Sequence, residues 1–197
     1  MRIISGKFKG TNLYGPFDKK IRPLKDMVRE SIFNFLIHSK KFSFKLKDSN
    51  ILDLYSGTGS FGLECLSREA DKVIFIEKDQ AAISILEKNI NKLKVKDSTK
   101  IFAGDVNNIL DKNKTFASLT SELKVDLIFC DPPFKEKEVE KLFKLVIAKN
   151  ILKKKGIIIF HRHKTSQEKI ERYFKIVDER IYGLSKIIVA QPNLFSI

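Results

Sequence analysis

Cysteine and long hydrophobic runs are both scarce in this sequence. The 197 residues include two cysteines, Cys65 and Cys130, which lie within apolar segments and lack the spacing of metal ligands. This pattern favours reduced thiols and argues against a disulfide framework or a zinc site. No apolar run approaches the roughly 18 residues of a membrane span, and no hydrophobic segment of a secretory signal follows Met1. We therefore expect a cytoplasmic protein that binds no metal ion and no membrane.

Acidic residues are also few, with 24 against 38 lysines and arginines, and the formal net charge is +14. Such a charge is typical of proteins that bind a polyanion, although a lysine-rich composition can arise without any nucleic acid. The distribution favours a nucleic acid, because residues 1–50 hold 12 basic and 4 acidic residues, a difference of +8. The length and the hydrophobic content of 43% indicate one globular domain with room for a small appendage.

The spacing of apolar residues predicts an N-terminal appendage over residues 1–48 and an α/β domain over residues 49–197. Weak alternation broken by glycines predicts a hairpin or loop over 1–22, and helical spacing from Met27 predicts a helix that ends near His38. In the larger part, apolar strands alternate with helices, and the last two β-rich runs have no room for a helix between them. We expect a Rossmann-like sheet of seven strands, mostly parallel, with an antiparallel C-terminal strand. The expected strands are 50–55, 72–77, 99–103, 125–130, 156–161, 174–182 and 184–190, and the helices between them are 60–69, 80–93, 106–111 and 136–150.

The segment from Asn50 to Gly62 has the pattern of a strand, a glycine-rich turn and the start of a helix. In α/β proteins this arrangement holds a nucleotide-like ligand at the carboxyl end of a strand, although it can also be a simple tight turn. Asp53 lies four positions before the first glycine, where its carboxylate would repel a pyrophosphate but attract an ammonium group. Glu77 ends the next predicted strand, where it can bind a ribose. These residues favour a cationic cofactor without phosphate, such as S-adenosylmethionine, over NAD.

The predicted strand over 125–130 leads directly into Asp131-Pro132-Pro133-Phe134. Two consecutive prolines stiffen the backbone and remove two N–H donors, so hydrogen-bond acceptors dominate this segment. The Asp131 carboxylate and the Pro132 carbonyl suit the two hydrogens of an exocyclic amine, and the Phe134 ring suits the face of a base. The simpler interpretation is a strand-terminating turn with an aspartate cap and a core phenylalanine. The glycine-rich turn upstream favours the functional interpretation.

The segments Asp53–Glu64 and Asp131–Phe134 together resemble class I S-adenosylmethionine-dependent methyltransferases that act on amino groups of bases. The segments Arg2–Gly10 and Arg22–Asn34 resemble those of the RsmD-type 16S rRNA (guanine-N2)-methyltransferases, and the similarity extends over nearly the whole chain. The resemblance implies S-adenosylmethionine as the methyl donor. It implies as acceptor the N2 amine of a guanine in 16S rRNA or in an assembly intermediate of the small ribosomal subunit.

The resemblance also implies roles for individual residues. Asp131, Pro132 and Phe134 would form the catalytic site. Asp105 is equally well explained as a helix N-cap. The cofactor would contact the turn after the first strand, the acid after the second and two residues after the third, namely Asp53, Tyr55, Gly57, Thr58, Gly59, Glu77, Asp105 and Val106.

Basic residues of the appendage are expected to hold the RNA, because the α/β fold does not itself require them. The alternative is that they only keep a lysine-rich protein soluble. The candidates for RNA contacts are Arg2, Lys7, Lys9, Arg22, Lys25 and Arg29.

Two features depart from the family pattern, namely Leu24, where threonine is usual, and His161-Arg162-His163, where relatives often carry an acid. We expect His161 and His163 to lie at the surface, and the sequence suggests no Ser/His/Asp or Cys/His arrangement.

Methylation of another base amine, such as adenine N6 in DNA, is an alternative function. RNA binding without catalysis is another, and a Rossmann dehydrogenase would instead bind NAD. We expect the protein to act as a monomer.

Overall fold

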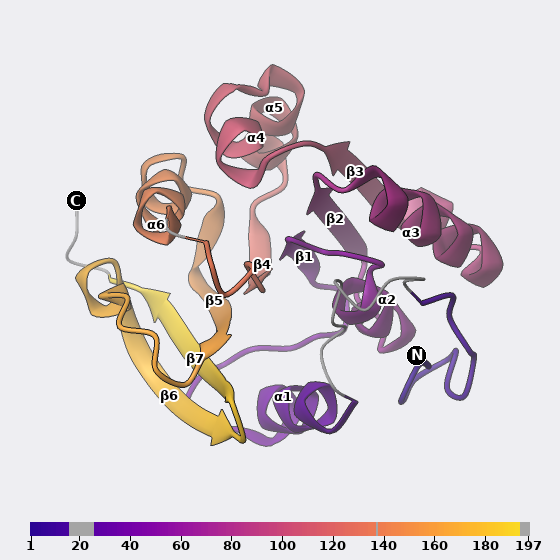
Figure 1. Ribbon diagram of the computed structural model, residues 1–197, viewed down its shortest axis with the longest axis horizontal. Coiled ribbons are helices and arrows are strands. Elements are labelled where there is room, and N and C mark those ends of the chain that lie inside the picture. Colours follow the sequence, from indigo (N-terminus) through magenta and orange to yellow (C-terminus); the bar gives the residue numbers. More distant parts are fainter. Residues whose placement is uncertain (16–25, 137, 194–197) are drawn as a thin grey trace.

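The computed structural model describes residues 1–15, 26–136 and 138–193, which contain one seven-stranded sheet with helices on both faces (Figure 1). Strands β1 to β5 are parallel, whereas β7 runs antiparallel to both β5 and β6. The order across the sheet is β3-β2-β1-β4-β5-β7-β6. The expected seven strands and the antiparallel C-terminal strand are thereby confirmed. The strands are β1 (Asn50–Leu54), β2 (Lys72–Glu77), β3 (Thr99–Ala103), β4 (Val125–Cys130), β5 (Leu152–His163), β6 (Phe174–Tyr182) and β7 (Ser185–Pro192).

The helices divide between the two faces of this sheet (Figure 1). One face is covered by α1 (Asp26–His38), α2 (Ser60–Ser67) and α3 (Gln80–Leu93). The other is covered by α4 (Val106–Lys112), α5 (Lys114–Glu122) and α6 (Val139–Ala148). Two short 3₁₀ helices, η1 (Lys96–Ser98) and η2 (Ile170–Arg172), complete the elements. Within the described ranges, no helix is both long enough and apolar enough to cross a bilayer.

Helix α5 is the one α-helix in these ranges that the sequence analysis did not predict. Its apolar pattern is weak, because only Phe116 and Thr120 are buried. Its start is set locally by the side chain of Asn113, which accepts a hydrogen bond from the Phe116 N–H at 2.9 Å. A cap and one anchoring aromatic residue are therefore enough for a helix that periodicity does not reveal.

Successive residues of a central strand contribute to opposite hydrophobic clusters. In β5, Ile157 and Ile159 belong to the cluster shared with α1, α2 and α3, whereas Ile158 and Phe160 belong to the cluster shared with α4 and α6. Strands that are buried on both faces need apolar residues at every position, which explains the continuous apolar runs in the sequence. Because the faces alternate along the strand, the position of a polar residue near the strand end decides on which of the two faces of the sheet it lies.

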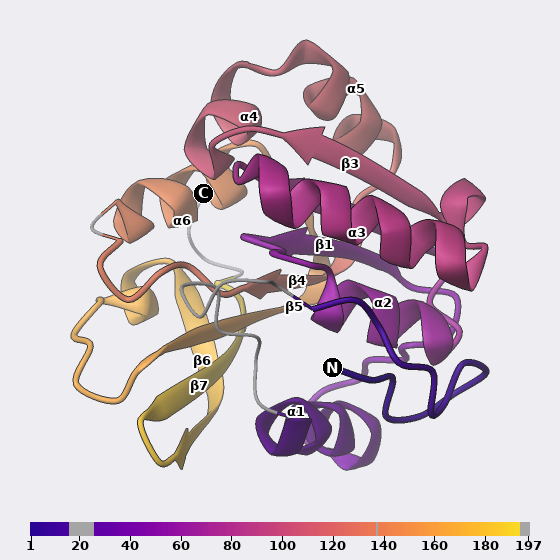
Figure 2. The same ribbon diagram turned by 45° about the vertical axis from the view of Figure 1, so that its right-hand side comes forward.

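Residues 1–15 run alongside α2 and α3, as Figure 2 shows. Ile3 and Leu13 are buried in the same cluster as α1 and α2, and an antiparallel bridge joins Arg2 to Asn12. At Gly6, where φ is +84°, a Cβ would lie 1.9 Å from a backbone oxygen of α2. Only glycine allows this close approach.

Two buried polar side chains fasten this N-terminal segment to the α/β part. The carboxylate of Glu64, which is fully buried, accepts hydrogen bonds from the N–H groups of Ile4 at 2.7 Å and Ser5 at 2.9 Å. Asn89 accepts from the Tyr14 N–H at 2.8 Å and donates to the carbonyl of Thr58 at 3.2 Å. Asn89 thus links the segment directly to the glycine-rich turn.

Candidate active site

Four neighbouring strands end in polar residues on the face that α1, α2 and α3 cover. Asp53 lies in β1, Glu77 in β2 and His161 in β5, and Asp131 directly follows β4. Each comes two positions after a core residue of that face. The ladders align the carboxyl ends of these strands at one edge of the sheet. The register therefore collects three carboxylates and an imidazole along this carboxyl edge, which is where α/β proteins bind their ligands.

The glycine-rich turn crosses the ends of β1 and β2. Gly57 and Gly59 both have positive φ, at 54° and 84°. The Gly57 N–H donates to a carboxylate oxygen of Glu77 at 2.8 Å, and the Gly62 N–H donates to Asp53 at 3.0 Å. At Gly59 a Cβ would lie 2.3 Å from the Leu86 side chain, so α3 packs directly against the turn. The turn is therefore held by the two acids that were expected to bind the cofactor.

Asp53 lies in an electronegative and almost water-free position. Its side chain is 1% exposed. Burial raises the pKa of this carboxyl well above its usual range, and the nearby charges of Asp131 and Glu77 raise it further, while the hydrogen bond from Gly62 opposes the shift. A cation placed here would relieve the repulsion among the three acids. The site is thus locally suited to positive charge, although the chain carries a net charge of +14.

Glu77 and Asp105 both accept backbone hydrogen bonds. Glu77 accepts from Gly57 at 2.8 Å, Lys78 at 2.8 Å and Asp79 at 2.9 Å. This leaves about one of the four acceptor positions of a carboxylate for a further donor. Asp105 accepts from the Asn108 N–H at 3.1 Å and caps α4, which confirms the predicted N-cap.

The remaining residues expected at the cofactor surround the turn. Tyr55 is half-buried, and burial raises the pKa of its hydroxyl. Thr58 and Val106 are buried, with 4% and 2% exposed. The hydroxyl of Ser56 is buried and has no hydrogen-bond partner among the described residues. The turn therefore contains a buried hydroxyl that no described residue bonds.

The Asp131–Phe134 segment follows β4 at the centre of the carboxyl edge. Phe134 is 49% exposed, so the simpler interpretation of this residue as a core phenylalanine is wrong. Its ring makes edge-to-face contacts with the rings of His161 and His163, with centroids 5.8 and 5.4 Å apart. An exposed aromatic ring next to a carboxylate offers a stacking surface for a planar group.

His161 is a site residue that the sequence analysis placed wrongly at the surface. It is 7% exposed, and its Nδ1 lies 2.7 Å from Oδ1 of Asp131. Its Nε2 lies 2.9 Å from Oγ of Ser185 in β7, so the expectation that no Ser/His/Asp arrangement exists is also wrong. The alternation of residues along the strand would have placed His161 on the same buried face as Ile157 and Ile159. Contact with Ser185 depends on the pairing of β5 with β7.

Arg162 approaches the same segment from the opposite face of β5. It is 4% exposed and donates to the carbonyls of Pro133 at 2.8 Å and Glu136 at 3.1 Å. Its guanidinium also forms an ion pair with Glu168 at 2.5 Å. The basic triplet at the end of β5 is therefore not a solvated charge cluster, since two of its members hold the Asp131–Phe134 segment in place.

Comparison with known proteins shows the family of this chain. A family model described as "Conserved hypothetical protein 95" matches residues 1–191. The chain belongs to this family. It is similar to ribosomal RNA small subunit methyltransferase D of Buchnera aphidicola subsp. Baizongia pistaciae, with 32% identity over 165 residues, 84% of this chain and 77% of the relative. It is also 30% identical to YlbH of Bacillus subtilis over 191 residues, 96% of this chain and 97% of the relative.

Solved structures extend this comparison to the fold. The structure of YhhF from Escherichia coli superimposes with a TM-score of 0.81 at 26% identity, covering 98% of both chains. SMU.776, solved in complex with SAH, has a TM-score of 0.63 at 15% identity, covers 83% of this chain and 49% of its own, and shares the fold. The protein is accordingly an S-adenosylmethionine-dependent methyltransferase of the RsmD-like family.

The basic N-terminal residues of this methyltransferase fall into two groups. Arg2, Lys7 and Lys9 are exposed. Arg29 is fully buried and donates to the backbone carbonyl of Arg2 at 2.6 Å while pairing with Asp26 at 2.9 Å. The expectation that Arg29 contacts RNA is therefore wrong, because its guanidinium is enclosed and already bonded. Two other expected RNA contacts, Arg22 and Lys25, lie outside the described residues. Leu24, which departs from the family pattern, lies outside them as well.

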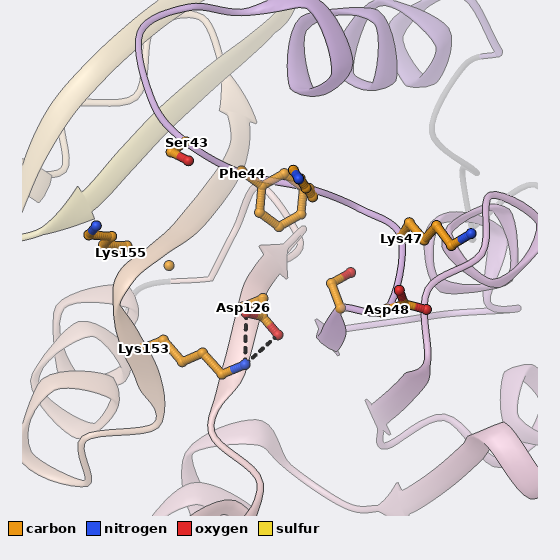
Figure 3. A pocket seen from close by; sticks show the side chains of 10 residues that line it. Ser43, Phe44, Lys47, Asp48, Asp126, Lys153 and Lys155 are labelled. Atoms are coloured by element: carbon orange, nitrogen blue, oxygen red, sulfur yellow. Dashed lines mark hydrogen bonds and ion pairs between the residues drawn. The ribbon is translucent and has the colours of Figure 1, made fainter.

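The amino edge of the sheet carries a different feature of the methyltransferase. A hollow of about 250 Å³ lies there, lined in part by Lys45, Lys47, Lys153 and Lys155 (Figure 3). The ammonium of Lys153 pairs with Asp126 at 2.8 Å. Across the described ranges, no cluster of three or more histidine, cysteine or acidic residues has the arrangement of a metal site.

Proposed function

We propose that this methyltransferase modifies the exocyclic N2 amine of a guanine in small-subunit ribosomal RNA. The observation that carries the proposal is the row of three carboxylates at the carboxyl edge with the exposed Phe134 ring beside Asp131. The names of relatives support the substrate, since those from Buchnera aphidicola and Escherichia coli are ribosomal RNA small subunit methyltransferases.

The residues at the edge suit S-adenosylmethionine. When bound, this cofactor supplies a methyl group carried by a positively charged sulfur. Asp53 and the turn over Tyr55, Gly57, Thr58 and Gly59 would hold its methionine part, since a buried acid with a raised pKa gains most from a nearby ammonium.

The nucleoside part of the cofactor would extend toward β2 and β3. The free acceptor position of Glu77 would take a ribose hydroxyl, and Asp105 with Val106 would lie beside the adenine. The order of β1, β2 and β3 in the sheet supports this direction, because their ends succeed one another along the edge.

The acceptor amine would lie on the other side of the turn, against Asp131. Among the described residues, the Pro132 carbonyl and Oδ2 of Asp131 have no hydrogen-bond partner. These two oxygens would accept the two N2 hydrogens while the base stacks on Phe134. Hydrogen bonds of this kind draw the nitrogen lone pair out of conjugation with the guanine ring, which makes the amine a better nucleophile.

The charge of Asp131 then assists the transfer. Transfer would form the bond from the amine nitrogen to the methyl carbon, break the sulfur–carbon bond and leave a neutral thioether. The nitrogen would become positive, and a carboxylate within hydrogen-bond distance would stabilise that charge. The nitrogen afterwards loses one proton to Asp131 or to water. Positioning and electrostatics carry the rate, and no covalent bond to the enzyme forms.

The RNA would be held outside this pocket by the N-terminal part. Exposed Arg2, Lys7 and Lys9 lie on the segment that Glu64 and Asn89 fasten to the α/β part. Phosphate contacts there would position a splayed guanine without reading its sequence. Residues 1–48 would thus serve as the RNA-binding part of a protein that acts as a monomer on free 16S rRNA or on a subunit assembly intermediate.

A substrate assay tests the proposal directly. The protein is incubated with labelled S-adenosylmethionine and, separately, with naked DNA, free 16S rRNA and small subunits from bacteria that lack the corresponding enzyme. We expect label in ribosomal RNA as N2-methylguanine, and no label with the Asp131→Ala variant. Methylation of adenine N6 in DNA, or none in any of the three substrates, would overturn the proposal.

A further inference from the structure

Asp131 is the first member of a hydrogen-bonded chain of three side chains. Nδ1 of His161 lies 2.7 Å from Oδ1 of Asp131, and Nε2 of the same ring lies 2.9 Å from Oγ of Ser185. Both ring nitrogens are therefore used, by groups from different elements. Because the histidine is 7% exposed, water competes little for these bonds.

Strand pairing brings these side chains together. The β4–β5 ladder runs up to the residues just before Asp131 and His161, so the two are neighbours across the strands. In the antiparallel β5–β7 ladder, Ser185 pairs with His163, two positions from His161. Residues two apart on a strand share a face, so Ser185 is a diagonal neighbour of His161. The arrangement is thus held by strand pairing within the sheet.

One assignment of hydrogens satisfies all three groups when Asp131 is ionised. The Nδ1–H of a neutral His161 donates to Oδ1 of Asp131, and the Ser185 hydroxyl donates to Nε2. Oδ2 of Asp131 is then left for the acceptor amine. A carboxylate held at one oxygen keeps the other in a fixed direction, which is the condition for precise alignment in the transition state.

The same ring also contacts the proposed stacking residue. The ring centroids of Phe134 and His161 are 5.8 Å apart with an interplanar angle of 76°, an edge-to-face contact. His161 consequently contacts both side chains that would bind the acceptor base.

We propose that His161 is a positioning residue for methyl transfer and that Ser185 holds its ring in place. This inference rests on the proposed role of Asp131 in binding the acceptor amine. His161 acts through Asp131 and Phe134, so its loss affects alignment of the base and not binding of the cofactor.

Kinetics of His161 variants test the role. His161→Phe keeps a planar ring and removes both nitrogens. With small ribosomal subunits as acceptor, we expect kcat to fall by about 10- to 100-fold, the cost of slight misalignment. The Kd for S-adenosylmethionine should change less than about twofold, since the lost interaction acts on the transition state. His161→Asn, whose amide N–H can take the place of Nδ1–H, should restore most of the rate.

A matched control and a spectroscopic measurement complete the test. His38→Phe replaces an exposed histidine at the end of α1 and should leave kcat unchanged. Long-range ¹H–¹⁵N spectra at alkaline pH should show a protonated Nδ1 and an unprotonated Nε2 on His161. Ser185→Ala removes the hydrogen bond to Nε2 and should lower kcat by less than His161→Phe does, while Nδ1 stays protonated because Asp131 still accepts from it.

The outcomes separate this inference from the proposed function. Wild-type kcat in a folded His161→Phe variant, or a ring protonated at Nε2 instead of Nδ1, would overturn the positioning role alone. Failure of His161→Asn to recover activity would also count against it. Normal turnover in Asp131→Ala would instead refute the proposed role of Asp131.

Discussion

The two edges of the sheet carry charged residues in opposite settings. At the carboxyl edge, Asp53, Glu77 and Asp131 lie close together, are buried or half-buried, and accept hydrogen bonds from backbone or side chains. At the amino edge, exposed lysines surround a hollow of about 250 Å³, and Lys153 pairs with Asp126 (Figure 3). Charge is plentiful at both edges, but the lysines at the amino edge are exposed, whereas Asp53 at the carboxyl edge is 1% exposed.

This difference decides which edge can do chemistry. Exposed ion pairs typically contribute about 0 to 1 kcal/mol, because water and salt screen them. Burial raises the pKa of Asp53, and the nearby charges of Asp131 and Glu77 raise it further, so this position favours a cationic ligand. Strand β4 joins the two edges, since Asp126 lies near its start and Asp131 directly follows its end. The two side chains are similarly exposed, at 25% and 24%, so they differ in their neighbours and not in their burial.

The largest effect should come from replacing Asp131 by alanine, with the same replacement at Asp126 as the control. Asp131→Ala should lower kcat by at least about 100-fold, the scale for removing one preorganised electrostatic group, with little change in the Kd for S-adenosylmethionine. Asp126→Ala removes the same charge from the other end of the strand and should leave kcat within about twofold. Single-turnover methyl transfer to small subunits measures both. Equal losses in the two variants would remove the functional distinction between the edges.

The glycine-rich turn should show the next largest effect. Gly57→Val should weaken S-adenosylmethionine binding by at least about tenfold, because the left-handed backbone disfavours a β-branched residue by at least about 1 kcal/mol and the ligand needs the space. Gly10→Val is a matched control, since Gly10 also has a positive φ, at 84°, and no atom lies near its Cβ position. Calorimetric titration reports both affinities. An unchanged affinity in a folded Gly57→Val variant would show that the ligand lies elsewhere.

The exposed charges can be compared by their effect on RNA binding. Replacing Arg2, Lys7 and Lys9 by alanine should weaken binding across RNA sequences. It should also flatten the slope of log K against log salt by roughly 2, at about 0.7 per single-strand contact. Cofactor affinity should not change.

A second triple variant removes the same charge at the amino edge and should alter the salt slope less. Its positions are Lys45, Lys47 and Lys155. Fluorescence titrations of 16S rRNA fragments at several salt concentrations give both slopes. If the two triple variants behave alike, the basic residues act only through net charge.

The smallest effect concerns stability at the carboxyl edge. Because burial raises the pKa of Asp53, the folded protein holds its proton more tightly than the unfolded chain. Stability is therefore lost as pH rises from the pKa of an unfolded aspartate, about 4, toward the raised value. Asp53→Asn carries no such charge, so its Tm relative to wild type should increase over that range in the ligand-free protein, while affinity for S-adenosylmethionine falls. A Tm difference that is independent of pH would contradict the raised pKa.

Much of the fold and part of the site could be predicted from local sequence. The central strands are buried on both faces, so their apolar runs stand out, and the glycine-rich turn and the Asp131–Phe134 segment directly follow two of them. For Asp105 the sequence offered an N-cap as one of two interpretations, and the structure shows the cap, because capping depends on residues within one helical turn. Patterns of this range determined the sheet, its antiparallel end and the position of the acids.

Contacts between distant segments decided the remainder. Whether a charged residue is exposed depends on what packs against it, and for Arg29 and Glu64 the partners include backbone of residues 2 to 5. His161 became a site residue because strand pairing placed it between Asp131 and Ser185, 30 and 24 positions away in the chain. Sequence alone determined where the strands end and which residue types stand there. Only the tertiary structure decided which of those polar groups are enclosed and bonded to one another, because burial and pairing depend on the packing of segments that are remote in the chain.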